Sequence, residues 1–296
     1  MIECVPNLSE GRNAETIDRA SAAITSHGAR LLDVHVDPDH HRSVLTVVGS
    51  QEAVAGGILG LVETVLPLID LKQHEGVHPR MGAVDVVPFV PLEGETMDDA
   101  VAVARRVGRE IGEGLRIPVY LYEAAASRPE RVNLAAVRRG GLRGVGERIG
   151  TPDGAPDFGP SEVHPTAGAV AVGARRFLVA YNINLTTSDV GAAKAIAASI
   201  RAAGGGLPGV KALGLRLAGR RLAQVSMNLT DVEATTMATV FRRVAAAAHR
   251  LGVAVLESEI VGLVPRAAFG DATAEELKLS KPLAALTLED RIEAAG

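Results

Sequence analysis

The C-terminal half of the chain carries the clearest alternation of apolar and polar positions. A period of two residues predicts strands, and a period near 3.6 predicts amphipathic helices. Strands are expected at 176–184, 211–217, 222–227 and 253–259, and helices at 189–203 and 231–251. The Ala-Gly-Arg turn at 218–220 is typical of a hairpin between the two middle strands. The resulting order, βαββαβ, is that of a ferredoxin-like sandwich.

The N-terminal half repeats this order and extends it. Strands are expected at 2–6, 30–36, 43–48, 84–90 and 118–122, and helices at 13–26, 51–69 and 96–112. Antiparallel pairs mixed with helices predict an α+β fold of two ferredoxin-like subdomains in tandem. We expect subdomains at 1–175 and 176–270, and a C-terminal tail at 271–296 that forms one loosely attached helix.

A stretch dense in glycine and proline, 150–173, separates the two halves. It can be interpreted as a linker. Long loops inside compact folds are often functional, however, which makes a binding loop the alternative interpretation.

The composition of the chain argues against nucleic-acid-binding, disulfide-stabilised and membrane-spanning proteins. The chain has 296 residues, of which 47% are hydrophobic, and a net charge of −4, so it has no basic field to attract nucleic acid. A single cysteine, Cys4, excludes an internal disulfide and favours a reducing cytoplasm. No stretch approaches the roughly 18 apolar residues of a membrane span, and no targeting signal is visible. We therefore expect a cytoplasmic protein without nucleic-acid or membrane partners.

The segment from His74 to His78 spells H-E-x-x-H, a zinc hydrolase signature. That signature requires a helix, which Gly76 weakens and Pro79 opposes at the residue before it. We therefore expect no metal, and the zinc hydrolase is a disfavoured alternative. A loop histidine just before a strand can act instead as a general acid and base, which makes His78 the catalytic candidate. Arg80 could hold a substrate carboxylate through two parallel hydrogen bonds.

A second polar cluster spans residues 33–43. Asp33, His35 and Asp37 share one face of the predicted strand, because strand side chains repeat every two residues. A solvated hairpin, a substrate-facing surface and a metal site are all compatible with this pattern. Metal is disfavoured because the neighbouring His40 and His41 point apart in a regular strand. Asp85 is expected to be a polar strand residue or a partner of Arg80.

Short motifs along most of the chain, taken together, resemble the formiminotransferase family, also called glutamate formimidoyltransferases. They occur in family order over about residues 2–265. They are ECVPNLSEG at 3–11, LDV at 32–34, RSV at 42–44, HPRMG at 78–82, DVVPF at 85–89, PVYLY at 118–122, PDFGP at 156–160, GAR at 173–175, NINL at 182–185, AQVS at 223–226 and VGLVP at 261–265.

This resemblance implies an activity and its substrates. The family transfers a formimidoyl group from N-formimidoyl-L-glutamate to N5 of tetrahydrofolate, in histidine degradation. Tetrahydrofolate is then the acceptor substrate and a homodimer the expected assembly. Some members carry an additional cyclodeaminase domain, and this chain is expected to contain only the transferase.

The resemblance also implies site residues. The family's catalytic histidine falls on His78, and Arg80, Arg42, Asn7 and Asn184 are the candidates for substrate binding. The folate-binding loop falls on Gly159, Pro160, Ser161, Glu162, Val163, His164, Pro165, Thr166, Ala167 and Gly168.

Two positions depart from the family pattern. His35 stands where an aspartate that assists the catalytic histidine is expected, so His35 is a second catalytic candidate. Ala167 stands where the loop often has tryptophan, and loss of that ring would weaken stacking on the pterin. These departures motivate the alternative of a non-catalytic folate-binding protein. Transfer of a formyl group is a further alternative that sequence does not separate.

Overall fold

The computed structural model describes residues 1–74, 80–217 and 219–295. They form two compact units, Met1–Arg175 and Arg176–Gly296, each with its own sheet and helices. The fold is of mixed α+β type, as predicted.

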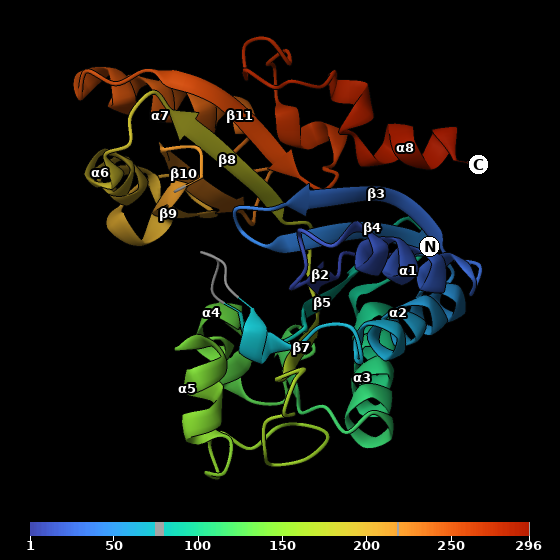
Figure 1. Cartoon of the computed structure of the whole chain (residues 1–296). Coiled ribbons are helices and arrows are strands. Elements are labelled where there is room, and N and C mark those ends of the chain that lie inside the picture. Colours follow the sequence, from blue (N-terminus) through green and yellow to red (C-terminus); the bar gives the residue numbers. More distant parts are fainter. Residues whose placement is uncertain (75–79, 218, 296) are drawn as a thin grey trace. The chain divides into compact units, whose positions relative to one another are not determined.

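The second unit contains a four-stranded antiparallel sheet. Its strands are β8 (Val179–Leu185), β9 (Val210–Leu217), β10 (Leu222–Leu229) and β11 (Val255–Val261), in the order β11-β8-β10-β9. Helices α6 (Val190–Ile200) and α7 (Met237–Arg250) pack on one face of this sheet (Figure 1). Asp189 and Thr236 begin these helices by accepting hydrogen bonds from backbone N–H groups of the first turn. The order along the chain, βαββαβ, is the predicted one.

The C-terminal segment differs from the expectation of one loosely attached helix. It contains η5 (Arg266–Phe269), η6 (Leu283–Ala285) and α8 (Leu288–Ala294). Leu277 and Leu286 are buried in the core of the second unit, and Leu279 forms an isolated bridge with Ser258 of β11. The prediction was wrong because the apolar residues of this segment follow no helical period, and several of them, including Leu277, Leu286 and Leu288, are nevertheless buried.

The first unit contains a seven-stranded sheet. Its strands are β1 (Ile2–Cys4), β2 (Asn7–Leu8), β3 (Arg30–Asp37), β4 (Arg42–Gly49), β5 (Val84–Pro91), β6 (Val119–Glu123) and β7 (Val170–Ala174). β1 and β2 together replace the single predicted strand at 2–6, and each pairs antiparallel with β4 and β5. β3 is paired with β4, while β7 lies parallel between β5 and β6.

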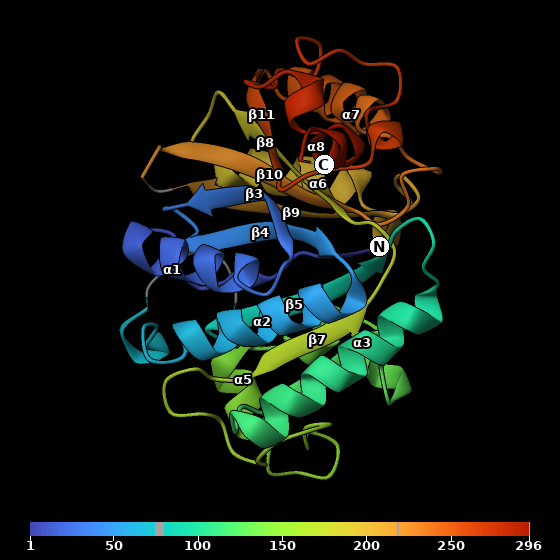
Figure 2. The same ribbon diagram turned by 90° about the vertical axis from the view of Figure 1, so that its right-hand side faces the viewer.

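Helices cover both faces of this sheet. Helices α1 (Ala14–Thr25), α2 (Gln51–Val65) and α3 (Met97–Arg109) lie on one side (Figure 2). On the other side α4 (Leu134–Val137) and α5 (Gly141–Arg148) contribute to a smaller apolar cluster with Tyr120 and Tyr122 of β6. The remaining helical turns are η1 (Leu71–Gln73), η2 (Glu110–Gly114), η3 (Pro129–Arg131) and η4 (Ala202–Gly204).

Three of these elements were not predicted, namely α4, α5 and β7. Part of the Gly- and Pro-rich segment 150–173 is therefore a central strand rather than a connection. Within the described residues, no helix is long and apolar enough to cross a membrane.

Candidate active site

The turn between β3 and β4 is tied to the chain that leads into β5. Arg80 donates from Nη1 to the carbonyl of His41 at 3.2 Å and from Nη2 to that of His40 at 3.0 Å. His41 adopts a left-handed backbone conformation, with φ of 48°, which costs free energy in a residue other than glycine. The guanidinium of Arg80 thus holds a strained turn in place. His78 belongs to residues 75–79, which lie outside the described part of the chain.

His74 completes this contact. Its ring stacks on that of His41 with centroids 3.8 Å apart, and its Nε2 is 3.1 Å from the carbonyl oxygen of His41. Nη1 of Arg80 lies 2.6 Å from Nδ1 and 2.5 Å from Nε2 of His74, so the guanidinium is in close contact with this ring. Burial, followed by the positive charge of Arg80, lowers the pKa of His74 to about 4. His74 is neutral at physiological pH.

The two histidines of the turn face different carboxylates. His41 Nε2 lies 3.2 Å from Glu10 Oε1, whereas His40 Nδ1 lies 3.2 Å from Asp37 Oδ2. Burial alone would raise the pKa of Glu10, but hydrogen bonds from the backbone N–H groups of residues 13 and 12 outweigh it and lower that pKa. Among the residues that the structure describes, no group of three histidine, cysteine or acidic side chains is placed to hold a metal ion.

Arginine side chains gather near the start of β4 and β5. Burial, followed by the positive charge of Arg138, lowers the pKa of Arg42 to about 10, and Arg80 adds to the same effect. Asp85 is a buried carboxylate close to these arginines. It accepts one hydrogen bond from Arg138 Nη2 at 2.6 Å and another from the backbone N–H of Met81 at 2.7 Å. Arg42, Arg80 and Arg138 thus lie within electrostatic range of the buried carboxylate of Asp85, and Arg42 is also influenced by Asp37.

Arg138 is a site residue that sequence reasoning missed. It caps the short helix α4, 53 positions from its partner Asp85 along the chain. Asp85 itself was expected to be a strand residue or a partner of Arg80. Asp85 is a residue of strand β5, as expected, and its charge acts on Arg80. Its short ion pair, however, is with Arg138, which no local pattern could have indicated.

The polar residues of β3 share one face, as predicted. Val34 and Val36 line a groove together with Ile17 and Ser21 of α1. Since strand side chains alternate, Asp33, His35 and Asp37 lie on the face that points away from α1. His35 is therefore on the same hairpin as His40 and His41, opposite Val44 in the register.

The candidate folate loop closes on itself at 164–168. His164 and Gly168 exchange two backbone hydrogen bonds of 3.0 Å, and His164 Nδ1 accepts from the N–H of Ala167 at 3.1 Å. Burial lowers the pKa of His164, which keeps this nitrogen an acceptor. Ser161, Glu162 and Pro165 are the exposed residues of the loop.

Backbone hydrogen bonds join this turn to the chain on both sides of residues 75–79. The N–H of Leu71 donates to Thr166 at 2.9 Å, and that of Ala83 donates to Ala167 at 2.9 Å. Ala169 in turn donates to Met81 at 2.9 Å. The structure thus brings the end of the predicted folate loop next to the residues that precede and follow segment 75–79.

Two glycines allow this close approach. Gly82 and Gly168 form an isolated bridge, and a Cβ atom at Gly82 would lie 2.1 Å from the carbonyl oxygen of Ala169. A Cβ atom at Gly168, where φ is 72°, would lie 2.3 Å from the carbonyl oxygen of Met81. Any other residue at either position would force the two backbones apart.

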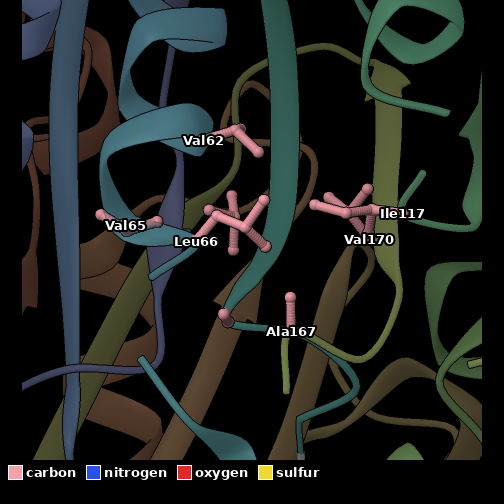
Figure 3. A pocket seen from close by; sticks show the side chains of 8 residues that line it. Val62, Val65, Leu66, Ile117, Ala167 and Val170 are labelled. Atoms are coloured by element: carbon pink, nitrogen blue, oxygen red, sulfur yellow. The ribbon is translucent and has the colours of Figure 1, made fainter. Parts of the chain in front are cut away.

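Ala167 corrects an expectation. Its side chain is 3% exposed and belongs to the main core of the first unit. Figure 3 shows it lining an apolar pocket with the side chains of Val62, Val65, Leu66, Ile117 and Val170. The methyl group therefore points into the protein, and the predicted loss of stacking on a pterin at this position does not fit the structure.

The remaining predicted residues fall in different units. Asn7 lies in β2 of the first unit and donates from Nδ2 to the carbonyl of Val5 at 3.0 Å. Asn184 lies in β8 of the second unit, within a network of polar side chains. Arg42, Arg80, His35 and the 159–168 loop all belong to the first unit.

Comparison with known proteins gives one family for both units. The N-terminal subdomain of the formiminotransferase domain matches residues 1–175, and the formiminotransferase domain matches residues 180–293. The glutamate formimidoyltransferase of Streptococcus pyogenes serotype M1 is 44% identical over 272 residues, which cover 92% of this chain and 91% of that protein. That of Thermoplasma acidophilum is 44% identical over 300 residues, covering 100% and 98%.

A longer relative is matched in part. The formimidoyltransferase-cyclodeaminase of Rattus norvegicus is 44% identical over 281 residues, which are 93% of this chain and 52% of that protein. Both family models and these relatives agree over nearly all of the sequence. The chain belongs to the formiminotransferase family.

Proposed function

We propose that this protein transfers the formimidoyl group of N-formimidoyl-L-glutamate to N5 of tetrahydrofolate, which yields L-glutamate and 5-formimidoyltetrahydrofolate. The observation that carries the proposal is the junction between the 159–168 loop and the chain on both sides of residues 75–79, next to the arginine cluster. Relatives named glutamate formimidoyltransferase that match over nearly their whole length support the same activity.

The reaction requires one group that exchanges protons. N5 of the folate attacks the amidine carbon, a C–N5 bond forms, and the bond from that carbon to the glutamate nitrogen then breaks. His78 takes the proton released by N5 and returns it to the departing nitrogen. General acid–base catalysis of this kind contributes about 10²- to 10⁴-fold. His35, on the polar face of β3, is the candidate to assist it.

The arginines near Asp85 are the proposed partners of the two carboxylates of the glutamate moiety, because a guanidinium can hold a carboxylate through two parallel hydrogen bonds. Arg42, Arg80 and Arg138 lie close to Asp85, and Arg80 also holds the β3–β4 turn. Asn7 and Asn184 are further candidates for contacts with the substrate.

The folate is proposed to bind along the 159–168 loop. Backbone groups of the loop and its exposed residues Ser161, Glu162 and Pro165 are the parts that a pterin could contact. Ala167 contributes its backbone, because its side chain is buried.

The assembly follows the family in this proposal. Each unit has the strand order of a ferredoxin-like sandwich, extended in the first unit by β6 and β7, and the protein acts as a homodimer. Light scattering coupled to size-exclusion chromatography measures the mass in solution, and a monomer would refute the dimer alone.

A direct assay tests the activity. The protein is incubated with N-formimidoyl-L-glutamate and tetrahydrofolate, and the folate product is followed by its absorbance. Parallel reactions use N-formyl-L-glutamate as donor. Formation of 5-formimidoyltetrahydrofolate supports the proposal. Product formed only with the formyl donor would show that the protein transfers a formyl group and not a formimidoyl group. Folate binding without any product would favour a non-catalytic binding protein.

A further inference from the structure

The face of the second sheet that α6 and α7 leave uncovered carries polar side chains in register. Gln224, Asn184 and Glu257 are direct neighbours across β10, β8 and β11. The next row on the same face holds Asn182 beside Glu259. The alternate residues of these strands, such as Ile183 and Val225, lie in the apolar core beneath the helices.

Side-chain amides donate the hydrogen bonds of this face, and each series of these bonds ends at the carboxylate of Glu257 or Glu259. Asn184 Nδ2 donates to Glu257 at 2.9 Å, and Asn182 Nδ2 donates to Glu259 Oε1 at 2.9 Å. Gln224 Nε2 donates to Asn184 Oδ1 at 3.0 Å and to Glu259 Oε1 at 3.3 Å. Each of these amide nitrogens therefore donates at least one hydrogen bond within the protein, and that of Gln224 donates two.

Acceptors remain unused. Oε1 of Gln224, a residue with no exposed surface, has no hydrogen-bond partner among the described residues. Rotating the amide would not help, because its oxygen would then face the oxygens of Asn184 and Glu259. Oε2 of Glu259 likewise receives no hydrogen bond within the described chain, although a carboxylate can accept about four. A buried acceptor without a donor is rare in native proteins and indicates a missing partner.

The two glutamates differ in this respect. The carboxylate of Glu257 also pairs with Arg220 at 2.6 Å. Its hydrogen bond from Asn184 is the largest cause of a lowered pKa, and the pair with Arg220 adds to it. Glu259 has no arginine or lysine partner among the described residues, and its side chain is only partly buried. Among the described residues, the carboxylate of Glu257 therefore has a cationic partner, whereas that of Glu259 has none.

We propose that Glu259 and Gln224 bind a planar N–C–N edge that presents two N–H donors. A carboxylate beside a second acceptor matches such an edge through two parallel hydrogen bonds. Two ligands have this chemistry, and their identity rests on the proposed function. One is the cationic amidine of the formimidoyl donor, and the other is the edge formed by N3 and the 2-amino group of the pterin.

Calorimetric titration of Glu259→Gln distinguishes the two sources. N-formimidoyl-L-glutamate and folic acid, which has the same pterin edge, are each titrated separately. We expect the affinity for one of them to fall about 10- to 100-fold, the range for a hydrogen bond to a charged group. A loss confined to the amidine places the donor substrate at this face, and a loss confined to folic acid places the pterin there.

Matched variants guard against a general effect on folding. Glu257→Gln should change either affinity less than about 3-fold, because Arg220 and Asn184 already occupy that carboxylate. Glu259→Asp keeps the charge and should retain part of the affinity, while Gln224→Met, of similar volume, should weaken the same ligand as Glu259→Gln does. Thermal unfolding shows whether each variant is folded.

The proposal is overturned if Glu259→Gln binds both ligands as the unaltered protein does, or if Glu257→Gln loses as much. Full affinity in Gln224→Met would remove Gln224 from the site. Because binding is measured without turnover, a chain that binds both ligands and transfers nothing would refute the proposed function alone.

Discussion

The first and second units place their polar groups in opposite ways. In the first, arginines gather around Asp85, and the groups are positioned by loops and backbone hydrogen bonds. In the second, carboxylates and amides sit on regular strands and leave unused acceptors near Glu259. The position of a polar group thus depends on loop contacts in the first unit and on strand register in the second.

The largest effect is expected at His78. If the chemistry belongs to the first unit, His78→Ala should lower kcat by at least about 100-fold and leave folate affinity largely intact. His249→Ala, at an exposed position of α7, is the control and should turn over normally. Transfer at the normal rate by His78→Ala would place the chemistry elsewhere.

Removal of Arg138 tests whether the arginine cluster is also structural. Arg138→Met leaves Asp85 buried without its partner and should lower the free energy of unfolding by about 3 kcal/mol. The double variant with Asp85→Asn should recover part of that loss. Urea denaturation provides the values. Arg143→Met breaks an exposed pair with Glu147 and should cost less than about 1 kcal/mol. Equal losses at Arg138 and Arg143 would contradict a buried pair.

Acidification should weaken the contact between His74 and Arg80. The pKa of His74 is about 4 in the fold and near its ordinary value of about 6.5 in the unfolded chain, so the unfolded chain binds more protons between these values. Stability contributed by neutral His74 is present above about pH 6.5 and is lost as pH falls toward 4. Since solvent reaches this side chain, we expect a loss on the order of 1 kcal/mol.

Denaturation of the native protein and His74→Gln at about pH 7 and about pH 4.5 measures this loss. The variant should lose less stability than the native protein on acidification. An identical pH dependence in both proteins would show that His74 is not the titrating group.

The smallest effect concerns Ala167. Ala167→Val adds two carbon atoms to the apolar pocket of Figure 3, which is too small to hold both, and should lower the free energy of unfolding by about 1 kcal/mol. Folic acid affinity should change less than about twofold. A clear change in the affinity for folic acid, with stability unaltered, would show that the side chain of Ala167 contacts the folate.

Several strands could be predicted because apolar and polar side chains alternate along them. β9 and β10 alternate clearly, and their positions followed from that pattern. β7 does not alternate, since all five of its residues are buried, as in a parallel strand covered on both faces. Helix α5 begins at Gly141 and contains Gly144, and this glycine content concealed its helical period.

The candidate site was only partly accessible from sequence. The prediction that Asp33, His35 and Asp37 share a face was confirmed, because a strand period decides it. Arg138 could not be found, because its meaning comes from a partner distant in the chain. Gln224 and Glu259 were also missed, since an unused acceptor is visible only when every neighbouring donor has been placed.

The joint between the 159–168 loop and the segment around Gly82 has a consequence for evolution. Its hydrogen bonds connect main-chain atoms of Thr166, Ala167 and Ala169 to their counterparts, so they persist whatever side chains these positions carry. Only Gly82 and Gly168 are fixed by the close approach. Substitutions at the exposed positions Ser161, Glu162 and Pro165 should therefore leave this joint of main-chain hydrogen bonds in place.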